Sequence, residues 1–170
     1  MKIIAVTGPE SSGKTTFCRV LQHLTQGVVI PEYSRVYLRN KKEYDLQDLE
    51  VMAQGQMENL RKIMEANPKT IICDTDMTVM TIWCDERFGL VPDSIQALCN
   101  DEHYDLLFLC APDIPWEADP LRENPDDRDR LFEVYKEKLT TSGKRHVVIN
   151  GSELDREKTA RKALLQVGLL

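Results

Sequence analysis

The sequence has no long hydrophobic run, and this absence excludes one class of protein. No segment of the 170 residues contains the roughly 20 consecutive apolar residues that a membrane-spanning helix needs. Met1 is followed by a short strand-like stretch and not by the apolar run of a secretory signal. We therefore expect a soluble, cytoplasmic protein with no membrane partner. No internal repeat or long linker interrupts the chain, so we expect 1–170 to form one domain.

An excess of positive charge is also missing. The chain has 22 Lys and Arg against 28 Asp and Glu, which gives a formal net charge of −6. Proteins that bind nucleic acid or anionic membranes broadly need a cationic surface to replace the counterions that binding releases. We therefore expect no nucleic-acid partner, and any phosphate site has to be locally basic.

Cysteine pairs of the metal-binding kind are absent as well. The five cysteines are Cys18, Cys73, Cys84, Cys99 and Cys110, and they show neither a CxxC pair nor zinc spacing. Most of them lie in apolar runs, which is typical of buried thiols in a reducing compartment.

What the sequence does contain begins with a glycine-rich loop. The stretch Gly8–Thr15, GPESSGKT, follows the apolar run Ile3–Val6 and precedes an amphipathic segment. It matches the P-loop pattern, in which two glycines let successive backbone N–H groups point into one concavity that binds phosphate oxygens. A Gly/Ser-rich turn between a strand and a helix is the alternative. The residues expected to bind ATP are Gly8, Glu10, Ser11, Ser12, Gly13, Lys14, Thr15 and Thr16.

Two side chains of this loop have chemical roles of their own. Lys14 is long enough to reach the β- and γ-phosphates of ATP, and we expect it to act in catalysis. The Thr15 hydroxyl is expected to ligate a Mg²⁺ ion that bridges these phosphates. The expected cofactor is therefore Mg²⁺, with ATP as co-substrate.

Apolar runs and amphipathic stretches alternate along the chain, which predicts an α/β fold. The expected strands are 2–7, 28–30, 70–73, 106–109 and 146–150. The expected helices are 16–24, 46–66, 78–88, 92–99, 124–139, with Asn124 as N-cap and Pro125 next, and a last one that a Ser152–Asp155 capping box begins. Together they predict a three-layer sandwich with a five-stranded parallel sheet, the P-loop NTPase fold, and a small helical lid at about 112–130.

Two acids follow the third expected strand. Asp74 and Asp76 stand where a parallel strand ends, which is the edge at which ligands bind in such sheets. The arrangement is similar to a Walker B motif, so Asp74 is the expected Mg²⁺ ligand beside Thr15. Either acid is a candidate general base for an acceptor hydroxyl, and the sequence leaves the choice open. Asp76 also has a structural alternative as the N-cap of the helix 78–88.

Other polar residues occupy positions that favour a ligand site. Glu32 and Arg35 follow the second expected strand and are candidates for substrate binding, with a local ion pair as the alternative. Gln56 interrupts the apolar face of the helix 46–66 and needs hydrogen-bond partners, either a ligand or a nearby loop. Gly55 is unfavourable inside a helix, which indicates a close backbone approach at that point.

The two tryptophans are expected to differ in role. The segment 111–122 contains three prolines and has no hydrophobic period, so we expect a loop over the site. Trp116 lies in this loop and is a candidate for stacking on a flat ring, with burial against the body of the protein as the alternative. Trp83 falls within a helix among apolar neighbours, and we expect it to be buried.

Three arginines lie in or after this loop. Arg122 and Arg128 are expected to act in catalysis by closing on phosphates as a lid, since arginine offers bidentate donors and stays charged. Arg130 follows Asp126 and Asp127 by four and three residues, so we expect it to form a surface ion pair.

These features favour a small-molecule kinase among P-loop proteins. A GTPase needs an NKxD motif after a late strand, and Asn40–Glu43 is imperfect and too early. An arginine-bearing lid suits a kinase, because it excludes the water that competes with the acceptor for the phosphoryl group. A nucleotide-binding regulatory module that transfers no phosphate is the alternative from another class.

Five stretches in this order resemble one known family: Gly8–Thr16, 31–35, 53–56, 74–76, and Trp116 with 119–122. Together they resemble the ribosylnicotinamide kinase domain of the NadR family. The resemblance implies MgATP-dependent phosphorylation of the 5′-hydroxyl of nicotinamide riboside, which gives nicotinamide mononucleotide. It also implies that Trp116 stacks on the pyridine ring.

The resemblance further implies that Glu32, Tyr33 or Arg35 lies near the riboside. One departure concerns the lid, where Pro120 replaces the glycine that the family usually has after the aspartate. The expected partners are ATP and a nucleoside-type small molecule, and another nucleoside or metabolite is the alternative acceptor. The DNA-binding and adenylyltransferase modules of longer family members are not found in this sequence. The oligomeric state and the preference for ATP over GTP are not assigned.

Overall fold

The fold was described from a computed structural model that covers residues 1–41, 43–118 and 125–170. In these residues a parallel sheet has the strand order β2-β3-β1-β4-β5. The strands are β1 (Lys2–Thr7), β2 (Val28–Ile30), β3 (Thr70–Asp74), β4 (Leu106–Cys110) and β5 (His146–Ile149). The five expected strands and their parallel arrangement are therefore confirmed.

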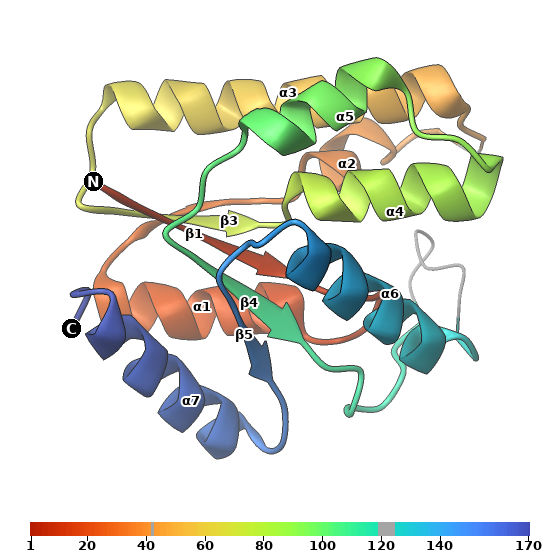
Figure 1. Cartoon of the computed structure of the whole chain (residues 1–170). Coiled ribbons are helices and arrows are strands. Elements are labelled where there is room, and N and C mark those ends of the chain that lie inside the picture. The colour runs from red at the N-terminus through yellow and green to blue at the C-terminus, as the bar shows by residue number, and fades with distance from the viewer. Residues whose placement is uncertain (42, 119–124) are drawn as a thin grey trace.

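Helices cover both faces of this sheet (Figure 1). They are α1 (Lys14–Thr25), α2 (Tyr33–Tyr37), α3 (Leu46–Glu65), α4 (Met77–Phe88), α5 (Asp93–Asp101), α6 (Arg128–Thr141) and α7 (Glu153–Gln166). Helices α1 and α7 lie on one face, and α3, α4, α5 and α6 lie on the other. The result is the expected three-layer sandwich.

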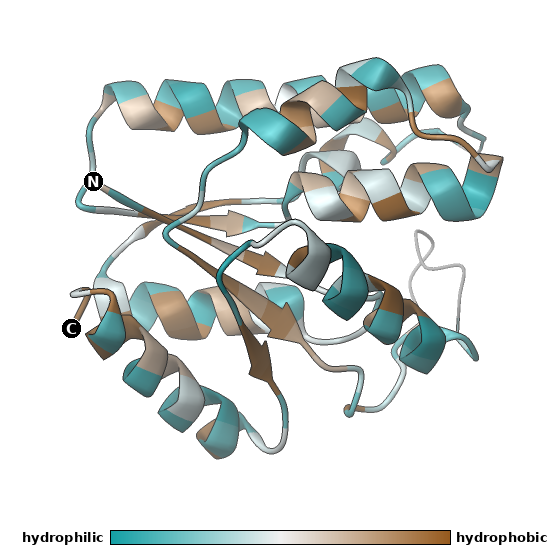
Figure 2. Ribbon diagram, in the orientation of Figure 1, coloured by the Kyte–Doolittle hydropathy of each residue, from teal (hydrophilic) through white to brown (hydrophobic). Residues whose placement is uncertain are grey.

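Successive side chains of the strands point alternately into two hydrophobic cores, one on each face of the sheet. Ile4 and Val6 of β1 pack with α1 and α7, whereas Ala5 between them packs with the helices of the opposite face. Because successive side chains of a strand point to opposite faces, a strand covered on both sides has to be apolar throughout. Figure 2 shows this contrast, with hydrophobic strands between helices that carry both hydrophobic and hydrophilic residues.

Capping residues set several helix boundaries. The side chain of Asp76 accepts a hydrogen bond from the N–H of Val79, and Ser152 and Asp155 form a capping box at the start of α7. The capping box predicted at Ser152 is thus confirmed, and the alternative given for Asp76 is the one found. The prediction of Pro125 as the first helical residue is wrong, because α6 begins at Arg128.

The first residue of α6 makes tertiary contacts. The side chain of Arg128 donates to the carbonyls of Ser11 and Ile114, and the N-cap Asp127 has no side-chain capping hydrogen bond. Residues 111–118 form an irregular loop. Pro120, Arg122 and Asn124, with the remainder of the expected lid, lie outside the described residues.

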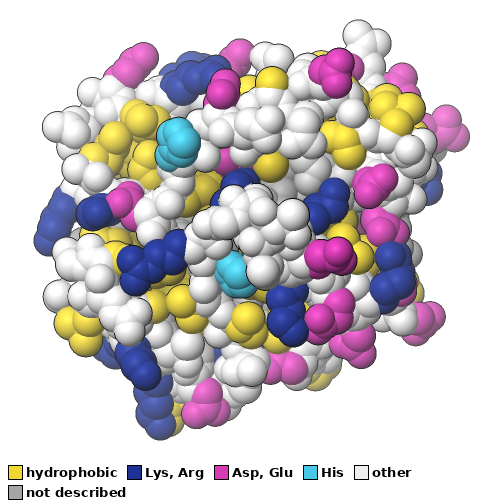
Figure 3. Space-filling view, viewed as in Figure 1, with side chains coloured by type: hydrophobic (Ala, Val, Ile, Leu, Met, Phe, Trp, Pro, Cys, Tyr) yellow, Lys and Arg dark blue, Asp and Glu magenta, His cyan; other side chains and the backbone are white. Residues whose placement is uncertain are grey.

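The mixed charge of the surface and the burial of the cysteines agree with what the composition indicates. Figure 3 shows acidic and basic side chains interspersed on one face of the molecule. Within the described residues, no helix is both long and apolar enough to cross a membrane. Cys18, Cys73, Cys84 and Cys110 are buried free thiols, as expected, and Cys99 is half-buried. Burial raises the pKa of Cys84 to about 11, so this thiol stays protonated at neutral pH.

Candidate active site

A cavity of about 380 Å³ lies against the P-loop. Its wall comes from five parts of the chain that the fold brings together. They are residues 8–16 of the P-loop and α1, Glu32, Ser34 and Arg35 after β2, Val79, Ile82, Trp83, Glu86 and Arg87 of α4, Ile114 and Glu117 after β4, and Leu131 and Tyr135 of α6. All eight residues expected to bind ATP line this cavity.

The P-loop backbone takes conformations that explain its glycines. Gly8 has φ of 134° and Gly13 has φ of 84°, values that favour glycine. A Cβ atom on Gly8 would also lie 2.6 Å from the carbonyl oxygen of Cys110. Both glycines are therefore needed for this loop to pass between β1 and α1.

Lys14 extends back over the loop that it follows. Its ammonium group donates to the carbonyl oxygens of Gly8 at 2.8 Å and Pro9 at 2.9 Å. The hydroxyl of Ser12 donates to the same Pro9 carbonyl at 2.8 Å. The charge of Lys14 thus lies at the mouth of the phosphate-binding concavity, where a triphosphate would need it.

Thr15 and Asp74 meet at the end of β3. The Thr15 hydroxyl donates to Oδ2 of Asp74 at 2.7 Å, while Oδ1 of Asp74 is buried and has no hydrogen-bond partner among the described residues. Burial raises the pKa of Asp74, and the Thr15 hydrogen bond and the Lys14 charge oppose that shift. A hydroxyl and an unpartnered carboxylate oxygen are ligands that suit Mg²⁺, so these two residues fit the expected ion.

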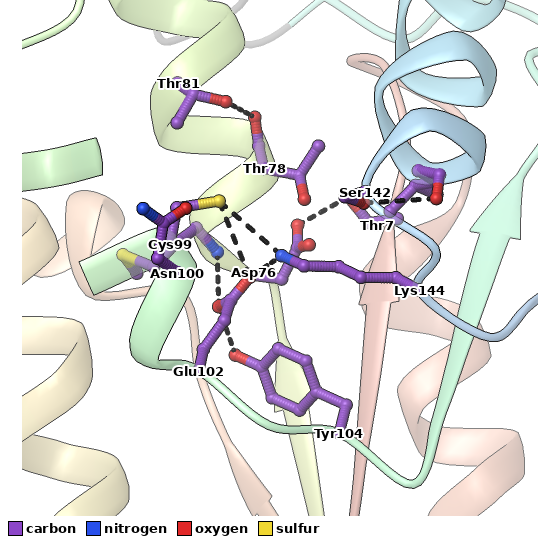
Figure 4. Close-up of polar contacts among 12 residues, drawn as sticks. Thr7, Asp76, Thr78, Thr81, Cys99, Asn100, Glu102, Tyr104, Ser142 and Lys144 are labelled. Carbon is purple, nitrogen blue, oxygen red and sulfur yellow. Dashed lines mark hydrogen bonds and ion pairs between the residues drawn. The ribbon is translucent and has the colours of Figure 1, made fainter. Parts of the chain in front are cut away.

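Asp76 is placed differently from Asp74. Its side chain accepts from the Thr7 hydroxyl at 2.7 Å and from the N–H of Val79 at 3.3 Å (Figure 4). The residue is fully buried and is not among those that line the cavity. The structure therefore gives Asp76 a capping role, and Asp76 does not reach the cavity.

Glu32 and Arg35, which follow β2 in the chain, both line the cavity. Arg35 Nε lies 3.3 Å from Glu32 Oε2, and the Ser34 hydroxyl donates to Glu32 Oε1 at 2.5 Å. The local ion pair considered as the alternative is thus present, and it lies within the cavity wall. The Glu32 side chain is held in place by its two neighbours.

Tyr33 and Gln56 are turned away from the cavity. Gln56 Oε1 accepts the N–H of Tyr33 at 2.8 Å, so its amide ties α3 to the segment after β2. The Tyr33 ring packs on α3 at Gly55, where a Cβ atom would come within 2.4 Å of it. The close approach predicted at Gly55 is confirmed, and its partner is a tyrosine ring.

Arg128 points inward and connects α6 to the P-loop. Its Nη1 donates to the carbonyl of Ser11 at 3.1 Å and to that of Ile114 at 3.0 Å. The guanidinium also lies over the ring of Trp116 at 5.7 Å, and the N–H of Glu117 donates to the Ser11 hydroxyl at 2.9 Å. The loop after β4 is thus fastened to the P-loop, with Trp116 against Arg128 and outside the cavity lining.

Arg130 forms the expected surface ion pair with Asp127, at 2.6 Å, and adds a second partner. Its Nη2 lies 2.5 Å from Oε2 of Glu86, a residue of the cavity wall. The pair therefore joins α6 to α4 at the edge of the cavity.

Sequence reasoning missed the wall that α4 contributes. Val79, Ile82, Trp83 and Glu86 lie three or four residues apart, so they share one face of the helix. Trp83 is half-buried and not a core residue, and its indole N–H donates to the hydroxyl of Tyr44 at 3.0 Å. The spacing was visible in the sequence, but it is the same spacing that a core-facing stripe has.

Arg156 of α7 is a second residue that the sequence did not single out. It is buried, with 6% of its surface exposed, and donates to the carbonyls of Ser12 at 2.9 Å and Ala111 at 3.1 Å. It also pairs with Asp113. Because these partners lie in segments far apart in the sequence, the contact of Arg156 with the P-loop becomes visible only in the structure.

Known proteins resemble this chain in sequence and in fold. The trifunctional NAD biosynthesis/regulator protein NadR of Salmonella typhimurium is 29% identical over 148 residues, which cover 81% of this chain and 36% of that protein. A NadR protein solved in complex with NR superposes with a TM-score of 0.80 at 23% identity, covering 98% of this chain and 50% of that chain. Deoxyadenosine kinase from M. mycoides superposes with a TM-score of 0.67 at 14% identity, covering 99% of this chain and 100% of that chain.

These likenesses confirm the P-loop NTPase fold and the resemblance to NadR. The chain spans about a third of the curated NadR protein. A family model described as AAA domain matches residues 3–156, which run from β1 into α7 and include every residue of the cavity wall. On this match the chain belongs to the AAA domain family.

Proposed function

We propose that the protein is an ATP-dependent nucleoside kinase whose acceptor is nicotinamide riboside. The observation that carries the proposal is that one cavity is lined both by a P-loop and by carboxylate and aromatic side chains from other elements. We propose that the P-loop binds the phosphate donor and that the other residues bind a ring-bearing acceptor. A pocket for ATP alone would not need the second set.

The P-loop forms the donor part of the site. Its N–H groups and the dipole of α1 favour the phosphates, and Lys14 supplies a charge that moves from the loop carbonyls to the β- and γ-phosphates. Mg²⁺, held by Thr15 and Asp74, would neutralise charge that develops on these phosphates during transfer. Arg128 is not among the residues that line the cavity, but it donates to the Ser11 carbonyl of the same loop, and in the proposal it is the lid arginine that closes on the phosphates.

We assign the general base to Glu32. It lines the cavity, whereas Asp76 is bound to the Thr7 hydroxyl and to the first turn of α4 and does not line it. In the proposed step Glu32 accepts the proton of the acceptor hydroxyl, and the hydroxyl oxygen forms a bond to the γ-phosphorus. The bond from that phosphorus to the β–γ bridging oxygen breaks, and ADP leaves with the electron pair.

The wall between α4 and α6 supports a flat, cationic ring as part of the acceptor. Trp83 and Tyr135 offer aromatic surface in this wall, and Glu86 of the same wall is paired with Arg130. The pyridinium ring of nicotinamide riboside carries a positive charge, which is favoured over aromatic faces. Neutral nucleosides lack this charge, so the aromatic faces favour nicotinamide riboside over them.

The comparisons support the proposal at a coarser level. One similar structure holds NR, and another is a nucleoside kinase. Both are below 25% identity, so they support the fold and not the acceptor. The chemistry of the cavity wall supports nicotinamide riboside as the proposed acceptor.

ADP release from MgATP over a panel of nucleosides tests the proposal. The panel contains nicotinamide riboside, adenosine, cytidine and uridine, with a reaction that lacks any acceptor as control. We expect release that depends on nicotinamide riboside. Release with another nucleoside alone would keep the kinase and replace its acceptor, while ATP binding without transfer to any of them would favour the regulatory module.

A further inference from the structure

A buried ion pair between Glu102 and Lys144 lies at the start of α4 (Figure 4). The Lys144 ammonium is 2.5 Å from Glu102 Oε1, and the Glu102 side chain has no exposed surface. Neither residue lines the cavity, and the proposed mechanism uses neither. A charged pair taken out of water is costly unless further hydrogen bonds hold it, so its partners indicate what it does.

Glu102 is bound to the backbone of α4. Its Oε2 accepts the N–H of Met77, the first residue of that helix, at 2.9 Å, and the hydroxyl of Tyr104 at 2.9 Å. The first N–H groups of a helix have no partner within it and need one from outside. Asp76 satisfies Val79, and Glu102 satisfies Met77 from 25 residues away. Two carboxylates therefore fix the first turn of α4.

Lys144 connects this first turn to the other wall of the cavity. Its backbone N–H donates to the carbonyl of Leu139 in the last turn of α6 at 3.2 Å, directly after Gly143 with φ of 67°. Its side chain then reaches Glu102. The chain of contacts thus runs from the end of α6 through Lys144 and Glu102 to the beginning of α4.

A second tie joins the same two helices at their other ends. Arg130, in the first turn of α6, pairs with Glu86, in the last turn of α4, and both side chains are partly exposed. The buried pair and the exposed pair therefore lie on either side of the stretch where Trp83 and Tyr135 line the cavity. In that stretch, the distance between α4 and α6 sets the width of the space that we propose binds the acceptor.

We propose that Glu102 and Lys144 are positioning residues that set the width of the acceptor slot between α4 and α6. The slot is defined by Val79, Ile82 and Trp83 on α4 and by Leu131 and Tyr135 on α6. The assignment of this slot to an acceptor rests on the proposed function. The Glu102–Lys144 pair is the more fixed tie, because the Glu102 side chain has no exposed surface and that of Lys144 is 16% exposed, whereas solvent weakens the more exposed Arg130–Glu86 pair.

Lys144→Met tests the proposal through steady-state kinetics. Removing the cation leaves the Glu102 carboxyl group buried without its partner. Its pKa is about 7, so above pH 7 the group is ionised in the unchanged protein, and in the variant it has to take up a proton or move together with the first turn of α4. We expect the KM for nicotinamide riboside to rise about tenfold, with the KM for ATP unchanged. A variant that is merely less stable would have fewer active molecules, which lowers kcat and leaves both KM values as they were.

The double variant Glu102→Gln with Lys144→Met supplies the rescue. Glutamine keeps an oxygen that accepts the N–H of Met77, and no unpaired charge remains. We expect the KM for the riboside to return to within about threefold of the unchanged protein. Lys2→Met is the matched control, because Lys2 pairs with Asp105 at 2.7 Å where β1 begins, at the edge opposite the P-loop. It should change neither KM.

Hydrogen–deuterium exchange tests the tie without any ligand or turnover. In Lys144→Met we expect faster exchange of the amides of α4, while the amides of α1 are unchanged. Unchanged exchange in α4, or equal changes in both KM values, would overturn the proposal. Faster exchange in α4 from a protein that phosphorylates no nucleoside would refute the proposed function and leave the tie in place.

Discussion

The hydroxyl of Thr15 donates a 2.7 Å hydrogen bond to Asp74 across 59 positions of sequence. Thr15 belongs to the first turn of α1, and Asp74 ends β3, which pairs with β1 through Val6 and Asp74. The sheet register therefore brings the P-loop and the acid together. This contact is the basis of the Mg²⁺ site that we propose for the kinase.

Asp74→Asn should lower turnover by about 100-fold or more, because an amide replaces the carboxylate that binds the cation. We expect the Mg²⁺ concentration that gives half-maximal activity to rise as well. The measurement is ADP release over a Mg²⁺ titration, with thermal unfolding as the check on folding. An unchanged Mg²⁺ dependence would remove Asp74 from the metal site.

Glu32→Gln and Asp76→Asn should separate catalysis from stability. We expect Glu32→Gln to lower kcat by about 100-fold or more with little change in melting temperature, since a general base is lost. Asp76→Asn should cost about 1–3 kcal/mol of unfolding free energy, because the Thr7 hydroxyl and the Val79 N–H bind its carboxylate, and it should retain turnover. The reverse pattern would assign the base to Asp76.

We expect substitutions of the two tryptophans to change acceptor binding to different degrees. Trp83→Ala should raise the KM for nicotinamide riboside about tenfold, because Trp83 lines the cavity. Trp116→Ala should act less on this KM, since its ring lies against Arg128 and outside the lining. Steady-state kinetics with both substrates varied separates the two. A larger effect at Trp116 would favour the stacking role that the family resemblance implies.

Arg156→Met should weaken ATP binding without changing the acceptor site. The variant leaves the carbonyls of Ser12 and Ala111 without a donor, so we expect the KM for ATP to rise about tenfold. Arg161→Met is the matched control, because Arg161 is on the same helix and pairs with Glu157 at the surface. Equal effects of the two substitutions on the KM for ATP would show that the contact of Arg156 with the P-loop does not contribute to ATP binding.

The raised pKa of Glu102 predicts that the stability of the protein depends on pH. Burial and, after it, the nearby Asp76 carboxylate raise the pKa of Glu102 from 4.5 to about 7. Between these values the folded protein binds the proton and the unfolded chain does not, so the contribution of Glu102 to stability falls as pH rises from 4.5 to 7. The difference in unfolding free energy between Glu102→Gln and the unchanged protein should therefore shift in favour of the variant over this range. Urea unfolding at pH 5 and pH 8 measures it, and a constant difference would contradict the shift.

The fold and the donor half of the site were predictable because both depend on local pattern. Strands buried on both faces read as continuous apolar runs, and the P-loop is a contiguous motif whose spacing is fixed by its chemistry. Asp74 was found because it directly follows such a strand. The caps at Asp76 and Ser152 were likewise local signals.

The acceptor half was less predictable because it is assembled from distant segments. Trp83 lies on a helix whose stripe looks like any core-facing stripe, and only the position of α6 turns that stripe into a cavity wall. Arg156 and Lys144 act on partners more than 40 residues away, so no sequence spacing indicates them. Sequence reasoning gave Gln56 two alternatives, a ligand or a loop carbonyl. In the structure its Oε1 accepts the N–H of Tyr33 instead, and its Nε2 has no partner among the described residues.

The measurement that tests the account most directly is ³¹P NMR of the protein with MgATP and nicotinamide riboside. The account predicts a new phosphomonoester signal, coupled to the protons of the 5′ carbon, that grows at the rate at which ADP forms and is absent with Lys14→Ala. Inorganic phosphate as the only product, or ATP that stays intact, would contradict it.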